Sequence, residues 1–353
     1  MVPFCPWYPH FQRRPVAYAI YTGSRRWKWV LHGRKSIRER SRRMYRSDLD
    51  RILARAFVKK PGLVYSEDYF MDLGLGHVFP AEKYSMAFQV LKKKGSVNSF
   101  HLLAPESATR EMLLLAHSAP YVDALLALEL TPMTQYSELP LNKVIVDAFC
   151  LAAGGTILAA REALKEGSAA NIGGGFHHAS ADRAEGFCYL NDLAIAIRVL
   201  QQEKKIKKAA VIDCDLHQGN GTAKIFFQDP TVYTFSIHQE DNYPPKEESS
   251  WDIGLPDFTG DEEYLQHLAL AVPKILDSFN PDLVLYQAGA DPYMDDRLGQ
   301  LSITKEGLQK RDRLVYAECR KRKIPVAVTL GGGYAEQVHD TVDIHCNSLE
   351  ALL

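Results

Sequence analysis

Residues 211 to 221 read Val211-Ile212-Asp213-Cys214-Asp215-Leu216-His217-Gln218-Gly219-Asn220-Gly221. The apolar residues from 209 to 212 predict a short buried β-strand, which runs into carboxylates and an imidazole and stops at glycines. Side chains alternate along a strand, so Asp213, Asp215 and His217 project to one side where the strand ends. A solvated polar loop after a core strand would also fit, but three metal-competent groups on one side favour a metal site.

The same order of strand, glycine and reactive group recurs along the chain. Residues 169 to 172 open into three glycines and then His177 and His178, residues 282 to 288 lead to Gly289 and Asp291, and residues 324 to 330 lead to three glycines and Tyr334. Helical patterns over residues 142–166, 190–202, 261–279 and 304–322 lie between and around these strands. This alternation predicts βαβ units and a mainly parallel sheet. Ligands bind beyond the carboxyl ends of such strands, so we expect the reactive segments to converge.

Three of the converging residues have the types of a catalytic metal site. Asp215, His217 and Asp291 would supply three protein ligands and leave room for water, which distinguishes a catalytic site from a structural one. The oxygen-rich set suits Zn²⁺ and would also accept Fe²⁺ or Co²⁺.

The remaining polar residues supply the other parts of a hydrolytic site. His177 or His178 would act as the base for a metal-bound water, and Asp213 and Asn220 could each accept a hydrogen bond from the second nitrogen of such a histidine. Tyr334, on its glycine turn, could donate its hydroxyl to an oxyanion. A lone histidine is more often a core residue with satisfied hydrogen bonds, but a glycine-flanked pair directly after a strand favours catalysis. Together these residues predict metal-assisted hydrolysis of an amide.

The composition is that of a soluble α/β protein in a reducing compartment. The chain has 353 residues, 46% of them hydrophobic, and a formal net charge of −1. Its six cysteines are scattered without a C-x-x-C pair, which argues against a disulfide scaffold and against a thiolate zinc site. The longest nearly apolar run, residues 144 to 160, carries Asp147 and falls short of a membrane span. We expect a cytoplasmic protein, or a nuclear one in a eukaryote.

Residues 1 to 60 differ from the rest of the chain. They hold 16 Lys or Arg against 3 Asp or Glu, whereas the remainder holds 26 against 40. A weak basic helix is predicted between residues 34 and 60. The segment could be an organelle transit peptide or a contact for nucleic acid, but it contains no nucleic-acid motif, and basic runs are usually solvated. We interpret residues 1–60 as a disordered or partly helical extension and 61–353 as the catalytic domain.

Five separated motifs together resemble the zinc-dependent histone deacetylase superfamily, which includes acetylpolyamine amidohydrolases and acetoin-utilisation proteins. The resemblance covers about residues 61 to 345, in the order of the family. The motifs are His177-His178, Gly186-Phe187-Cys188, Asp213-x-Asp215-x-His217-x-Gly219-Asn220-Gly221, Gly289-x-Asp291 and Gly331-Gly332-Gly333-Tyr334. Short sequence motifs such as Asp182-Arg183-x-x-Gly186-Phe187-Cys188 and Asp296-Arg297-Leu298-Gly299 are most similar to the class IV branch and its bacterial relatives.

The resemblance implies a single arginase-like α/β domain with a mainly parallel sheet of about eight strands flanked by helices. It implies zinc on Asp215, His217 and Asp291, an acid/base pair in His177 and His178, and carbonyl polarisation by Tyr334. Gly186, Phe187 and Tyr243 would line a channel for an acyl-lysine stem, and Asp213, Asp215 and Ser236 resemble the K⁺ site of the family.

Two departures from the family pattern matter for function. Asn220 stands where many members carry Asp, which would make the second histidine less basic than the first. The acidic residue with which class I members grip the substrate backbone has no evident counterpart.

The leading functional hypothesis is a zinc-dependent hydrolase that removes acetyl or longer acyl groups from lysine side chains of proteins. Deacetylation of small amines such as acetylpolyamines is the alternative, and an acidic residue at a narrowed channel mouth would favour it. A metal-dead interaction protein is a third reading, which the full set of predicted catalytic residues disfavours.

Overall fold

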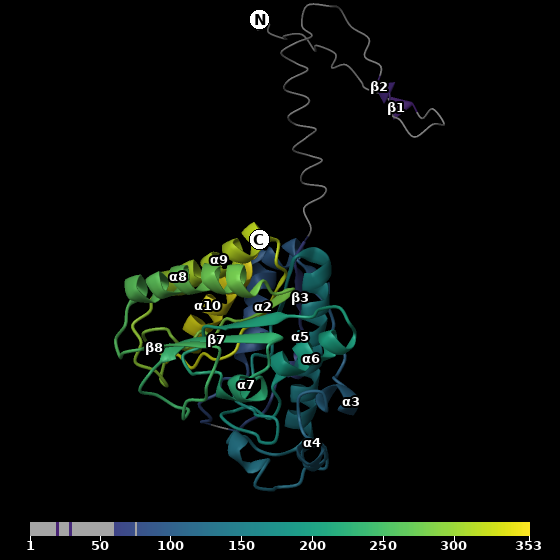
Figure 1. The fold of residues 1–353 in the computed structure, drawn as a ribbon, viewed down its shortest axis with the longest axis vertical. Coiled ribbons are helices and arrows are strands. Elements are labelled where there is room, and N and C mark those ends of the chain that lie inside the picture. Colours follow the sequence, from purple (N-terminus) through teal and green to yellow (C-terminus); the bar gives the residue numbers. More distant parts are fainter. Residues whose placement is uncertain (1–18, 21–27, 30–59, 75) are drawn as a thin grey trace, which may run out of the picture. The chain divides into compact units, whose positions relative to one another are not determined.

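The computed structural model describes residues 19–20, 28–29, 60–74 and 76–353 (Figure 1). Within the basic N-terminal segment, β1 (Ala19–Ile20) and β2 (Lys28–Trp29) pair antiparallel, and the sequence pattern did not predict these strands. The helix predicted between residues 34 and 60 lies outside the described residues. The interpretation of residues 1–60 as an extension therefore stays a prediction.

The catalytic region is built on one sheet of eight strands, in the order β4-β3-β5-β10-β9-β6-β7-β8. Every neighbouring pair in this sheet is parallel. The strands are β3 (Gly62–Val64), β4 (His101–Leu103), β5 (Ser168–Asn171), β6 (Ala209–Asp213), β7 (Val232–Gln239), β8 (Trp251–Leu255), β9 (Leu283–Gln287) and β10 (Val326–Thr329). The prediction of a parallel sheet of about eight strands in a single domain is confirmed.

Helices lie on both sides of this sheet, α5 and α6 on one side and α8, α9 and α10 on the other (Figure 1). Buried apolar side chains on these helices and on the strands form one continuous core. The helices are α2 (Lys83–Lys94), α3 (Arg110–Leu113), α4 (Ala119–Leu126), α5 (Lys143–Glu166), α6 (Asp192–Gln202), α7 (Asn220–Ile225), α8 (Asp261–Phe279), α9 (Lys305–Arg322) and α10 (Val338–Glu350). Short 3₁₀ turns occupy Glu67–Tyr69, Ser96–Ser99 and Gln135–Ser137.

The register of the strands brings polar residues into one row at the carboxyl edge of the sheet. Asp213 at the end of β6 pairs with Ser236 of β7 and with Gln287 of β9. Gln287 in turn pairs with Thr329 of β10, which pairs with Asn171 of β5. All five side chains are buried. The loops that follow β5, β6, β9 and β10 therefore leave the sheet side by side, as the recurring strand and glycine pattern predicts.

Helix α5 is the main core helix of the domain. Asn142 caps it by accepting a hydrogen bond from the backbone N–H of Ile145 at 3.0 Å. A Cβ on Gly154 would lie 1.7 Å from the carbonyl oxygen of Glu106, so a glycine at this position lets the helix pack closely against that segment. By length and mean hydropathy, α5 could cross a membrane. However, 72% of its most apolar window is buried inside the domain. Its apolar character is thus that of a core helix.

Candidate active site

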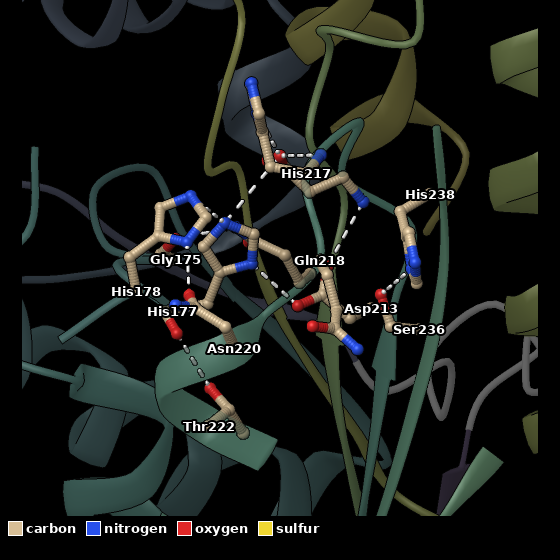
Figure 2. A network of polar contacts seen from close by, with 12 residues as sticks. Gly175, His177, His178, Asp213, His217, Gln218, Asn220, Thr222, Ser236 and His238 are labelled. Carbon is tan, nitrogen blue, oxygen red and sulfur yellow. Dashed lines mark hydrogen bonds and ion pairs between the residues drawn. The ribbon is translucent and has the colours of Figure 1, made fainter. Parts of the chain in front are cut away.

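The loops after the four central strands bring the predicted site residues together. Among the described residues, Asp215, His217 and Asp291 form a buried group whose potential ligand atoms all lie within 4.8 Å of one another. We call these three residues the ligand group. His177 and His178, called the histidine pair below, lie beside it, with ring centroids of His178 and His217 5.8 Å apart (Figure 2).

The ligand group has the dimensions of a zinc site. The Nδ1 atom of His217 lies 3.3 Å from Asp215 Oδ1 and 3.2 Å from Asp291 Oδ2. Zinc bonds of about 2.0 to 2.2 Å at tetrahedral angles place neighbouring ligand atoms roughly 3.3 to 3.5 Å apart, so the distances from the imidazole to each carboxylate are compatible with a metal such as zinc. One nitrogen and two carboxylates also fit the donor preference of this ion.

The charges of the ligand group favour a bound cation. Burial acts to lower the pKa of His217, but hydrogen bonds and charge interactions with Asp215 and Asp291 outweigh it and raise this pKa to about 10. Burial and the charge of Asp215 raise the pKa of Asp291 to about 6. Two carboxylates held this close in the interior repel each other, and a divalent cation between them would remove the repulsion.

Two glycines allow the carboxylates to approach. A Cβ on Gly289 would lie 2.3 Å from Asp215 Oδ2, and a Cβ on Gly332 would lie 2.1 Å from Asp291 Oδ2. Instead, the backbone N–H of Gly332 donates a hydrogen bond to Asp215 Oδ2 at 3.0 Å. These positions of the glycine motifs therefore accommodate the ligand group.

The histidine pair is held by two different partners. His177 lies between Asp213 and His178, with its Nδ1 2.7 Å from Asp213 Oδ2 and its Nε2 3.1 Å from His178 Nε2 (Figure 2). The Nδ1 of His178 lies 2.7 Å from Asn220 Oδ1. Both Nδ1 atoms donate to oxygen. The two Nε2 atoms face each other, so they form a hydrogen bond only if one of them carries a proton.

That proton belongs to His177. Burial opposes its charge, but Asp213 and Asp215 raise the pKa of His177 to about 9. Burial and the positive charges of His177 and His217 lower the pKa of His178 well below its usual value, and Asn220 provides no charge to oppose them. The predicted inequality of the two histidines is therefore present, with His178 the neutral member at neutral pH.

We expect Asn220→Asp to raise the pKa of His178 by roughly one to three pH units, the effect of an opposite charge in contact. If the neutral form of His178 is the active base, the acidic limb of the kcat/KM profile moves to higher pH by the same amount. Asn242→Asp, which adds the same charge on the loop beside Tyr243, is the control and should leave this limb in place. An unmoved limb in Asn220→Asp would show that His178 does not titrate as the base.

The loop that carries the histidine pair is fixed by residues that the sequence reasoning missed. The buried carboxylate of Asp192, at the first turn of α6, accepts hydrogen bonds from the backbone N–H of Gly175 at 3.0 Å and of Phe176 at 2.7 Å. The side chain of Asn191 donates to the carbonyl oxygens of His177 at 3.3 Å and of Ala179 at 3.1 Å. Both residues stand a few positions after the Gly186-Phe187-Cys188 motif, but as a helix start they give no functional signal in the sequence.

Replacing Asp192 by Ala should destabilise the fold by about 2 to 5 kcal/mol, because two buried N–H groups would lose their acceptor. The free energy of unfolding from urea titration measures this loss. Asp147→Ala is the matched control, since its carboxylate pairs with Lys143 on the exposed side of α5, and it should change stability little. A loss no larger than that of the control would contradict this role of Asp192.

Tyr334 is held at the site by a second set of residues. Its backbone N–H donates to the buried carboxylate of Asp296 at 2.7 Å. The ammonium of Lys83, fully buried on α2, donates to the carbonyl oxygens of Gly331 at 2.9 Å and Gly333 at 3.4 Å. Burial, Asp291 and Asp215 raise the pKa of the Tyr334 hydroxyl well above its usual value, so this hydroxyl keeps its proton and can donate it in a hydrogen bond. Charged residues such as Lys83 and Asp296 look solvated in a sequence, and neither was predicted here.

The predicted channel residues stand around this centre. The ring of Phe187 lies 5.9 Å from that of Tyr334 and 6.1 Å from that of Phe79. The ring of Tyr243 lies 5.3 Å from that of His178 and is 38% exposed. A Cβ on Gly186 would lie 2.6 Å from the Tyr243 hydroxyl, so a glycine at this position lets Tyr243 lie close to the loop. The aromatic channel stays a prediction.

The residues of the predicted K⁺ site lie on neighbouring strands. Asp213 and Ser236 are direct partners in the β6–β7 register. Asp213 Oδ1 accepts the backbone N–H of Asp215 at 3.1 Å, and the Ser236 hydroxyl is paired with His238 Nδ1 at 2.9 Å. The K⁺ site stays a prediction.

Comparisons with known proteins agree with the site. A family model described as the histone deacetylase domain matches residues 77–349. An uncharacterised protein of Picosynechococcus is 43% identical over 285 residues, which cover 80% of this chain and 95% of that protein. Histone deacetylase 2 of Arabidopsis thaliana is 31% identical over 291 residues, which cover 78% of this chain and 75% of the other. Histone deacetylase HDAC1 of Drosophila melanogaster is 30% identical, and the match covers 74% of this chain and 54% of that protein.

The fold has a solved counterpart as well. The crystal structure of the HDA15 HD domain matches with a TM-score of 0.69 at 23% identity, covering 82% of this chain and 90% of that domain. This likeness concerns the fold, whereas the family model and the relatives concern the sequence, and the class IV resemblance stays a prediction. The family model and the relatives show that the chain belongs to the histone deacetylase family.

Proposed function

We propose that this chain is a zinc-dependent deacylase that removes acetyl or longer acyl groups from lysine side chains of proteins. One observation carries the proposal, namely that the ligand group, the histidine pair and Tyr334 meet in one buried site at the carboxyl edge of the sheet. Family membership supports the class of reaction, hydrolysis by a deacetylase. The aromatic rings of Phe187 and Tyr243 suit an uncharged aliphatic stem such as that of an acylated lysine.

The chain supplies each proton step of this reaction. Bound zinc would polarise the acyl carbonyl and make water a stronger acid. His178 Nε2 accepts the proton of the attacking water, because its Nδ1 already donates to Asn220, and the hydrogen bond that His178 Nε2 accepts from His177 Nε2 breaks in this step. His177, charged through Asp213, then returns a proton to the departing lysine nitrogen. The Tyr334 hydroxyl donates to the oxyanion.

The test compares one purified preparation of the full chain, loaded with zinc, on three substrate classes: acetyl-lysine peptides, long-chain acyl-lysine peptides and acetylpolyamines. The proposal expects the highest kcat/KM on one of the peptide classes. Higher turnover of acetylpolyamines would favour the alternative, for which the carboxylates of Glu138 and Glu185 near Tyr243 are the supporting observation. No turnover of any of the three by the zinc-loaded chain would overturn both.

A further inference from the structure

A fully buried arginine lies beneath the ligand group, on helix α9. Arg311 has no exposed surface, although its neighbours Lys310 and Arg313 are exposed. A buried guanidinium is costly unless each of its donors finds an acceptor. The hydrogen-bond acceptors of Arg311 therefore indicate its structural role.

The guanidinium joins the two loops that carry the metal-competent carboxylates. Its Nη1 donates to the carbonyl oxygen of Cys214 at 3.1 Å and to that of Gly289 at 2.6 Å, and its Nη2 reaches the carbonyl oxygen of Ala288 at 3.4 Å. Cys214 directly precedes Asp215, and Gly289 stands two residues before Asp291. A single side chain thus bridges the ends of β6 and β9 at the peptide groups next to the ligands.

The arginine is itself held in place from the opposite side. Its Nε donates to Asp312 Oδ1 at 2.9 Å. The hydroxyl of Tyr286 donates to the same oxygen at 2.6 Å, and the hydroxyl of Ser348 on α10 donates to Asp312 Oδ2 at 2.5 Å. The buried carboxylate neutralises the guanidinium, and its hydrogen bonds to β9 and α10 fix the orientation of the pair.

We propose that Arg311 is a positioning residue of the metal site, which sets the separation of Asp215 and Asp291 by clamping their loops together from below. The inference rests on the metal site of the proposed function but not on its substrate. Arginine is required because its planar fork reaches several carbonyl oxygens at once, whereas the single ammonium of a lysine cannot hold both loops in the same geometry. Changes behind metal ligands typically weaken metal binding by about 10- to 100-fold.

The test is the zinc affinity of Arg311→Lys in the full chain, measured by competition with a chromophoric chelator at a temperature where all variants are folded. The expected result is a loss of about 10- to 100-fold in affinity and a smaller rise of Tm on adding zinc. Two controls lie on the same helix. Leu308→Ala removes a fully buried apolar side chain and lowers stability, and Arg320→Lys changes an arginine that donates to the carbonyl oxygen of Leu352. Both should keep wild-type zinc affinity.

Wild-type zinc affinity in Arg311→Lys would overturn the proposal, and so would an equal loss in Leu308→Ala, which would make the effect one of general stability. If Arg311→Lys does not fold, Ser348→Ala is tested in its place, because it removes only one hydrogen bond of Asp312. Ser348→Ala should weaken zinc binding more than Leu308→Ala does. Equal zinc affinity in these two variants would overturn the proposal. A chain whose zinc affinity depends on Arg311 but which hydrolyses no acyl-lysine would contradict the proposed function and leave this inference intact.

Discussion

Asp291→Asn should reduce kcat/KM for an acyl-lysine peptide by at least about 1,000-fold at trace zinc. Replacing a residue that only supports a metal ligand typically weakens metal binding by about 10- to 100-fold, and this substitution changes a ligand itself. The substitution keeps the shape of the side chain. An amide oxygen can still accept the backbone N–H of Leu216, which Asp291 Oδ1 accepts at 3.0 Å. The variant removes one negative charge from the ligand group, together with the carboxylate oxygen that lies 3.2 Å from His217 Nδ1.

The same variant should be no less stable than the wild type when zinc is removed by a chelator. The folded pKa of Asp291 is raised to about 6 by burial and by the charge of Asp215. A carboxyl whose pKa is raised by folding costs stability as the pH rises above its ordinary pKa, and the cost is fully present above pH 6. An uncharged amide avoids that cost at pH 7. Activity and stability should thus change in opposite senses.

Two measurements decide this prediction: zinc affinity by chelator competition, and Tm at pH 7 in excess chelator. Asp295→Asn is the matched control, since it makes the same substitution at an exposed position of the same loop and should change neither quantity. Wild-type zinc affinity in Asp291→Asn would exclude Asp291 as a ligand. A large drop in Tm would show instead that the lost activity reflects unfolding.

The ligand group and its strands could be predicted from the sequence because the signals are local. Alternation predicted Asp213, Asp215 and His217 on one side, although β6 ends at Asp213 and the other two stand in the bend that follows it. The parallel topology brings Asp291 and Tyr334 to the same edge. The edge strand β8 was not predicted, although Trp251, Ile253 and Leu255 alternate with less apolar residues as in a strand. Helix α10 was also missed, since its sequence mixes polar and apolar residues without a strong start signal.

The buried charges could not be predicted because their environment is set by tertiary packing. Arg311 stands in the run Lys310-Arg311-Asp312-Arg313, which looks like the solvated face of a helix. Two of these four residues are exposed, while Arg311 turns inward to carbonyl groups of other elements and Asp312 accepts hydrogen bonds from the hydroxyls of Tyr286 and Ser348. Lys83 is hidden in the same way behind the turn of Gly331 and Gly333. Arg311 and Lys83 thus bond to carbonyl oxygens 22 to 250 positions away, and no local pattern marks them.

Tyr334→Phe should lower kcat by about 100- to 1,000-fold with little change in KM, the usual cost of removing one donor to an oxyanion. The raised pKa of this tyrosine keeps the hydroxyl protonated across the working pH range, so the wild-type residue is a donor throughout. The ring itself should stay in place, because it packs 6.0 Å from the ring of Phe79 and 5.9 Å from that of Phe187, and the ammonium of Lys83 lies 5.1 Å from its centroid. Substrate binding therefore keeps its aromatic wall.

Single-turnover kinetics and zinc affinity separate this effect from a structural one. Tyr316→Phe, the control, also removes a buried hydroxyl, one that donates to the carbonyl oxygen of Ser348 away from the ligand group, and it should lower Tm without changing kcat. Tyr334→Phe should bind zinc as the wild type does, because the hydroxyl acts on the substrate oxygen and not on the metal. A kcat within a few-fold of the wild type would show that the oxyanion is stabilised by another donor, and a raised KM at constant kcat would assign Tyr334 to substrate binding alone.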